Sequence, residues 1–109
     1  MTDESVLIQY VGNTPKLRVM DFLIGNMPFD YSKKEIIEGS GISKTTFFKI
    51  WKDFVKFGIL KQTRKYGKAQ LYTIDKEHIF IKKLLALEFA LANEYAEKVV
   101  KSKAVLVRH

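Results

Sequence analysis

Two helix starts separated by a glycine turn constrain this chain more than any other feature. Ser32 stands three residues before Glu35, the spacing of a capping box, in which each side chain bonds the free backbone N–H of the other residue. The pair predicts a short helix with Ile36 and Ile37 on its buried side. Gly39-Ser40-Gly41 ends that helix, because such a run favours a turn.

A second helix follows this turn at once. Ser43 is a further N-cap residue, and the helix is predicted to run from about Lys44 to Phe57, ending at Gly58. Two helices joined by a tight glycine-containing turn, with basic residues on the second, are the pattern of a helix-turn-helix.

The segment before this pair holds one clear helix and one ambiguous stretch. Thr14 is a candidate N-cap and Pro15 suits the first helical turn, followed by one apolar stripe of Val19, Met20, Leu23 and Ile24. Residues 5–11 fit both a helical and a strand-like apolar pattern. Gly12 suits the end of a helix, so we favour a short helix there.

After Gly58 the apolar pattern changes. Residues 59–65 and 69–74 are strand-like, and Gly67 between them supplies the positive φ of a hairpin turn. Asp75 is a candidate cap for a last long helix from Lys76 to about Lys101, with residues 104–109 frayed. The chain is therefore expected to be mainly α with one β-hairpin, as a domain of residues 1–75 followed by a C-terminal helix and tail at 76–109.

The charge of the chain is concentrated in one segment. Residues 43–68 hold eight cations and one anion, Asp53, whereas the other residues hold eleven of each sign. The whole formal charge of +7 therefore lies in this segment. A solvated lysine-rich surface is the alternative, but such a surface usually mixes both signs, so we favour a patch that binds a polyanion.

The order of these elements resembles a winged helix-turn-helix domain, in which the hairpin is called the wing. The local sequence is similar to archaeal transcription regulators of this class over roughly residues 12–75. The similar segments are Gly12-Asn13-Thr14-Pro15-Lys16-Leu17-Arg18-Val19, Tyr31-Ser32-Lys33-Lys34-Glu35-Ile36, Gly41-Ile42-Ser43-Lys44-Thr45-Thr46, Phe57-Gly58-Ile59-Leu60 and Gly67-Lys68-Ala69-Gln70-Leu71-Tyr72.

Helical periodicity divides the helix at 44–57 into two faces. The core face is expected to carry Phe47, Ile50, Trp51, Phe54 and Val55. The opposite side carries Lys44, Thr45, Phe48, Lys49 and Lys52, with Thr46 at its N-terminal edge.

The resemblance implies that this second face is a recognition helix in the DNA major groove. The lysines would then meet phosphates or guanine, and the threonines phosphate or base edges. Phe48 would touch a thymine methyl, unless it is only a partly buried ring. Arg64, Lys65, Tyr66 and Lys68 of the wing at 64–68 would meet the adjacent backbone or minor groove, although Tyr66 suits ordinary packing equally well.

The last helix suggests a homodimer. Its apolar arc spans roughly 220°, about twice what packing on one core requires. One part is expected to cover its own domain and the other a partner's helix, although a fully intramolecular helix is the alternative. Glu88 lies within the arc and would need a partner, such as an interchain hydrogen bond. The candidate interface residues are Phe80, Leu84, Leu87, Glu88, Leu91 and Tyr95.

Residue types argue against an enzyme. The only histidines are His78, expected to be an ordinary surface residue, and the terminal His109; there is no cysteine, metal-spaced cluster or phosphate loop. No cofactor or metal is expected, no stretch approaches the ~20 apolar residues of a membrane span, and a cytoplasmic location is expected.

The predicted function is thus a sequence-specific transcription regulator that binds double-stranded DNA as a homodimer. A winged-helix module that binds an acidic protein, such as a component of the transcription machinery or a toxin, is the main alternative. RNA binding is a third possibility, although the deep groove of an RNA helix is too narrow for a recognition helix.

Overall fold

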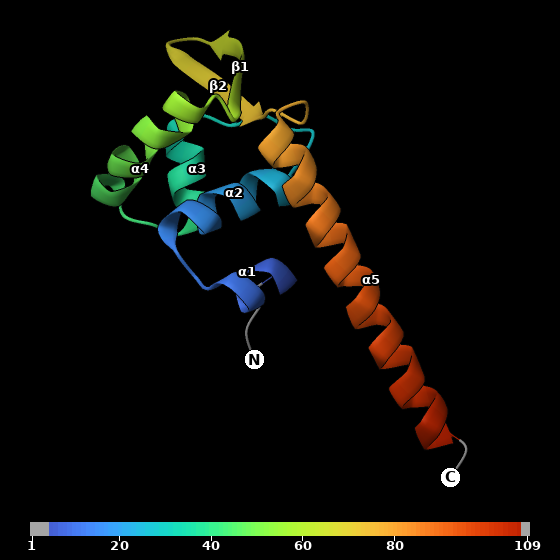
Figure 1. Ribbon diagram of the computed structural model, residues 1–109. Coiled ribbons are helices and arrows are strands. Elements are labelled where there is room, and N and C mark those ends of the chain that lie inside the picture. The colour runs from blue at the N-terminus through green and yellow to red at the C-terminus, as the bar shows by residue number, and fades with distance from the viewer. Residues whose placement is uncertain (1–4, 108–109) are drawn as a thin grey trace.

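This computed structural model describes the backbone of residues 5–107 and the side chains of residues 5–100. The described backbone contains five helices and two strands, joined by short loops (Figure 1). In chain order they are α1 (Val6–Val11), α2 (Pro15–Gly25), α3 (Lys33–Ser40), α4 (Lys44–Phe57), β1 (Leu60–Tyr66), β2 (Ala69–Ile74) and α5 (Ile79–Val107).

The predicted capping residues start the helices. The Glu35 N–H donates to Ser32 Oγ at 3.2 Å and the Ser32 N–H donates to Glu35 Oε1 at 2.9 Å, which confirms the capping box of α3. Thr14 Oγ1 accepts from the backbone of α2, and Ser43 Oγ accepts the Thr46 N–H at 3.1 Å at the start of α4. The helix-turn-helix therefore begins and ends where its sequence signals predict.

The ambiguous N-terminal stretch is a helix, as favoured. Ser5 Oγ caps α1 by accepting the Ile8 N–H at 3.2 Å. Leu7 and Ile8 are buried with Leu17 of α2 and Leu84 of α5 in a small second core. This contact explains the helix, because six residues cannot form a stable helix without tertiary packing.

The strands form the predicted antiparallel hairpin. Tyr66 pairs with Ala69 across the two-residue turn Gly67-Lys68, where Gly67 has φ of 63°. A glycine with positive φ at the first turn position is typical of a type II′ hairpin. The register shifts between Gln62 and Arg64, so the strand is irregular at Thr63.

One main core holds the helix-turn-helix, the hairpin and the start of α5 together. Gly39 of α3 lies so close to the Phe22 ring of α2 that a Cβ there would clash with the ring. The buried residues of this core are Val19, Leu23, Ile36, Phe47, Trp51, Phe54, Ile59, Ile74 and Ile81.

Val55 does not belong to this core, contrary to the sequence-based expectation. Its side chain is 61% exposed, whereas Phe47, Trp51 and Phe54 are buried as predicted. Val55 follows Phe48 by seven residues, which returns it to the same side of the helix. It therefore extends the exposed face of α4.

The last helix begins and ends later than predicted. Asp75 Oδ1 accepts the Glu77 N–H at 3.0 Å, so this side chain stabilises a turn and does not cap α5. His78 caps the helix instead, because its Nδ1 accepts the Phe80 N–H at 3.1 Å. The helix then continues through residues 104–107, which were expected to be frayed; residues 108 and 109 lie outside the described range.

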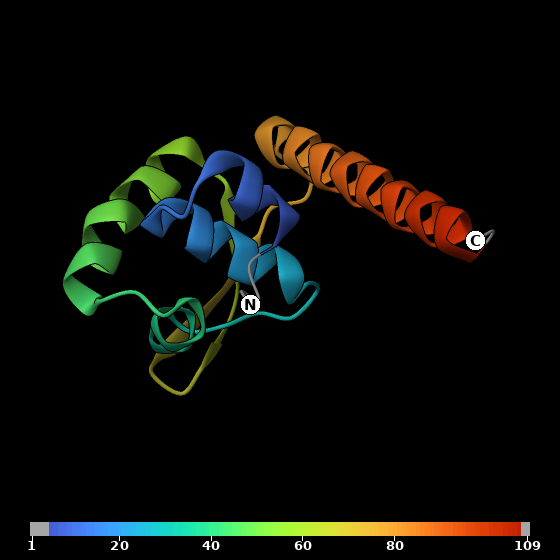
Figure 2. The same ribbon diagram turned by 90° about the horizontal axis from the view of Figure 1, so that it is seen from below.

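The architecture is a winged helix-turn-helix with a long C-terminal helix. Viewed from two directions, α4 and the hairpin lie toward one end and α5 extends away from them (Figures 1 and 2). The described chain measures 61 × 28 × 23 Å because of this helix. None of the helices within residues 5–107 has the length and apolarity needed to cross a membrane.

Candidate nucleic-acid interface

The face of α4 that is turned away from the core carries the predicted polar residues together with the exposed side chains of Phe48 and Val55. Lys44, Thr45, Lys49 and Lys52 are exposed. Thr46 is half-buried, and its Oγ1 lies 2.9 Å from Ser43 Oγ, so its hydroxyl is engaged at the helix start. The exposed lysines therefore dominate the charge of this face.

Phe48 was expected either to contact a thymine methyl or to be a partly buried ring, and its environment combines packing with exposure. Its side chain is 42% exposed, and its ring rests edge-on against Phe47 with centroids 5.4 Å apart. The ring is therefore partly packed and partly open to solvent.

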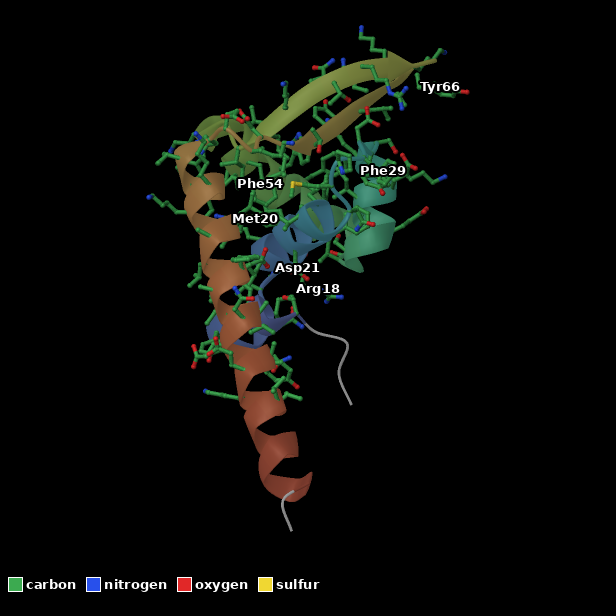
Figure 3. All side chains as sticks on the ribbon, turned by 90° about the vertical axis from the view of Figure 1, so that its right-hand side faces the viewer. Arg18, Met20, Asp21, Phe29, Phe54 and Tyr66 are labelled. Carbon is green, nitrogen blue, oxygen red and sulfur yellow. The ribbon has the colours of Figure 1, made fainter. Side chains whose placement is uncertain are left out.

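The tip of the hairpin is fully open. Tyr66 is 78% exposed and points outward at the end of the wing (Figure 3), which excludes its packing at the hairpin base in this structure. Lys65 and Lys68 near the turn are also exposed, as is Lys61 near the base of the hairpin, where it pairs with Thr73. The wing therefore presents one aromatic ring and three lysines to solvent.

Arg64 differs from these lysines, because it pairs with a carboxylate. Its Nε donates to Asp30 Oδ2 at 3.0 Å and its Nη2 to Asp30 Oδ1 at 3.3 Å. Thr63 also donates to Asp30, and these hydrogen bonds, first that of Thr63 and then that of Arg64, hold the pKa of Asp30 below its usual value. The arginine thus joins the wing to the loop before α3.

The other seven cations of residues 43–68 have no carboxylate within ion-pair distance among the described residues. We call these seven lysines the basic surface. The one anion of the segment is Asp53, and its Oδ2 lies 2.5 Å from Lys16 Nζ of α2. The hydrogen bond and the charge of Lys16 lower the pKa of Asp53. The members of the basic surface are Lys44, Lys49, Lys52, Lys56, Lys61, Lys65 and Lys68.

Lys33 is a further candidate residue of the nucleic-acid interface, and the sequence analysis did not identify it. Its ammonium lies 5.4 Å from the Trp51 ring centroid and 6.0 Å from those of Phe48 and Tyr72. Trp51 and Tyr72 meet edge to face at 4.9 Å, so α4 and β2 are joined beneath this cation. The rings come from distant parts of the chain, and no local sequence signal indicates this contact.

The expected dimer residues of α5 divide into two groups. Phe80, Leu87 and Tyr95 are exposed and Leu91 is half-buried. Leu84 is only 8% exposed because α1 covers it, so in this structure it is not available to a partner.

Glu88 is half-buried and faces its own domain. Burial, and then the charge of Asp21 in α2, raise its pKa above the usual value. The expected interchain hydrogen bond of Glu88 stays a prediction.

These elements define a winged-helix domain, and one solved structure shares the fold. The chain is similar to Sso10a-2, a DNA-binding protein from Sulfolobus solfataricus, with a TM-score of 0.50 over 85% of this chain and 96% of that one. The sequences are 19% identical, so the likeness concerns the fold. No protein-family model matches the chain, and a search of curated proteins also finds no match.

Proposed function

We propose that this protein binds double-stranded DNA as a homodimer and acts as a sequence-specific transcription regulator. In this proposal α4 enters the major groove and the wing meets the adjacent backbone or minor groove. The observation that carries it is the basic surface, seven lysines of α4 and the hairpin for which the described residues provide no carboxylate within ion-pair distance. Phosphate contacts of such cations supply most of the affinity of a DNA-binding protein.

The described contacts support a shared role for α4 and the wing. The aromatic contact between Trp51 and Tyr72 fixes the two elements relative to each other, and Lys33 adds a cation at their junction. Because this contact holds α4 and the wing in place, their main chain need not be reordered on a rigid duplex, and the entropy loss falls mainly on the side chains that contact it. The known DNA binding of Sso10a-2 is consistent with this use of the fold.

The homodimer is supported by the uncovered length of α5. Residues 92–98 are all exposed, and they include Tyr95. The radius of gyration is 16.7 Å, above the ~13 Å of a compact 100-residue domain, because this helix leaves the domain. A second copy of α5 would cover its apolar side and place two α4 helices on half-sites about 34 Å apart.

Charge reversal tests the DNA-binding surface. We expect Lys49→Glu and Lys52→Glu each to weaken binding to random duplex in a gel-shift assay, while thermal unfolding stays unchanged because both residues are exposed. Lys83→Glu on α5 is the matched control, with the same charge change on an exposed residue outside the basic surface. Equal affinities for all three variants would favour the protein-binding alternative, and preference for single-stranded RNA would favour the RNA alternative.

A further inference from the structure

A pocket of about 450 Å³ opens where α2, α4 and the start of α5 meet. Its α4 residues are Asp53, Phe54 and Phe57, and Phe57 follows Phe48 by nine residues, half a turn away around the helix. The pocket therefore lies behind the recognition helix relative to the proposed DNA contacts. Its volume is within the range of small-molecule sites, about 300–1,000 Å³.

The walls of the pocket are apolar and largely aromatic. Phe54, Phe57 and Phe80 supply three rings, and Met20 and Ile59 supply the remaining apolar surface. Phe57 is 58% exposed, so an aromatic wall is left open to solvent. Figure 3 shows Met20 and Phe54 near each other beside α5. A methionine adapts its shape readily to an aromatic ligand.

The polar groups of the pocket are already satisfied within the protein. His78 Nε2 lies 2.8 Å from the carbonyl oxygen of Phe57, and its Nδ1 accepts the Phe80 N–H. Lys16 and Asp53 compensate each other as an ion pair. The lining therefore carries no net charge, and burying a charged ligand group there would be costly.

We propose that this pocket binds a small uncharged aromatic molecule of one or two rings. Such a ligand would stack against the phenylalanine rings and bury them from water without requiring a charged partner. The lining matches this class in size, ring content and charge.

The inference extends the proposed function, because the pocket lies between the two elements that would set the geometry of a DNA-bound dimer. A ligand that separates Phe57 at the end of α4 from Phe80 at the start of α5 would change the angle between the recognition helix and the dimer helix. We expect an occupied pocket to change duplex affinity by about 5-fold or more, the lower end of typical allosteric coupling.

Binding is tested first without DNA, by an NMR titration of the full chain with indole as the probe. We expect saturable shifts and intermolecular nuclear Overhauser effects to the Met20 methyl group and the Phe54 ring. Phe57→Ala should weaken indole binding, whereas Phe29→Ala, which removes a similarly exposed ring far from α5 (Figure 3), should not. Benzoate, a ring of similar size with a negative charge, should bind more weakly than indole.

Several results would overturn the inference: no saturable shifts, contacts outside the pocket, unchanged binding by Phe57→Ala, or benzoate binding as tightly as indole. Indole affinity that falls as protein concentration rises would show that a second copy fills the pocket. The effect on DNA is measured afterwards, by duplex binding with and without indole, and an unchanged affinity would contradict the coupling. A chain that binds indole but no duplex would contradict the proposed function and leave the ligand site supported.

Discussion

His78 joins the end of the recognition helix to the start of the long helix, because its Nε2 lies 2.8 Å from the carbonyl oxygen of Phe57. Its Nδ1 accepts the Phe80 N–H, so the neutral ring with the proton on Nε2 satisfies both contacts. This role differs from that of the ordinary surface residue that the sequence suggested.

His78→Ala is expected to lower the free energy of unfolding by about 1–2 kcal/mol, since it removes both a helix cap and a hydrogen bond to a backbone carbonyl. Denaturant unfolding followed by the fluorescence of the single tryptophan, Trp51, measures this change. His78→Asn retains a capping side chain and should recover part of the loss. Equal stability of the alanine variant and the parent would show that neither contact contributes.

The Asp30–Arg64 ion pair holds the wing against the loop before α3, and we predict that removing it increases DNA affinity. Asp30→Asn adds one unit to the formal net charge of +7 and frees the guanidinium for phosphate. We expect tighter duplex binding and a salt dependence steeper by up to about 0.9 per subunit. Lys82 pairs with Glu77 away from the wing, so Glu77→Gln is the control for the charge change. Identical salt slopes for both variants would contradict a DNA contact by Arg64.

The same carboxylate predicts a pH dependence. The pKa of Asp30 is lowered in the folded state, first by the Thr63 hydrogen bond and then by Arg64, so the folded protein binds this proton less readily than the unfolded chain. The contribution to stability is therefore present above the ordinary aspartate pKa of about 4 and is lost as the pH falls through the lowered value. Comparing parent and Asp30→Asn unfolding between neutral and acid pH should show the difference shrinking on acidification; a constant difference would contradict the assignment.

Lys33 and its neighbour offer a matched pair. Lys33→Met removes the ammonium from above three rings at a half-buried position and is expected to cost at least about 0.5–1 kcal/mol of stability, the lower part of the range for cation–π contacts. Lys34→Met makes the same change at an exposed residue that has no ring contact among residues 5–100, and should cost less. Denaturant unfolding of both variants checks this, and equal losses would assign no stabilising role to the aromatic contact.

The fold was predictable from local signals. The caps Thr14, Ser32 and Ser43, together with the turn at Gly67, act within a few residues of their own backbone partners. The helix-turn-helix and the hairpin therefore appear in the structure nearly where the sequence places them. The start of α5 was placed wrongly because Asp75 forms a local turn, a competing use of the same side chain.

The candidate site was predictable only in part. The basic residues of α4 and the wing follow from periodicity and charge, but contacts between distant segments do not. Asp30 and Arg64 are 34 residues apart, and the rings beneath Lys33 come from α4 and β2. Leu84 was expected in the dimer interface because the sequence pattern of α1, the helix that covers it, was ambiguous.

The proposed homodimer predicts that a charge on the apolar side of α5, in the length of helix that leaves the domain, separates the subunits. Tyr95→Glu should give a monomer by analytical ultracentrifugation, because an unpaired carboxylate would be buried against the partner helix. Asn93→Glu introduces the same charge on the opposite side of α5 and should leave the dimer intact. A monomeric parent protein, or equal masses for the two variants, would contradict this interface.

The central claim is that the basic surface contacts the phosphates of duplex DNA, and the salt dependence of binding tests it most directly. If each subunit of a dimer neutralises ~4 phosphates, the logarithm of the affinity should fall against the logarithm of the salt concentration with a slope of about −7. Lys52→Glu should make this slope shallower and Lys83→Glu should leave it unchanged. A slope shallower than about −2 for the parent protein would show that these lysines do not face DNA.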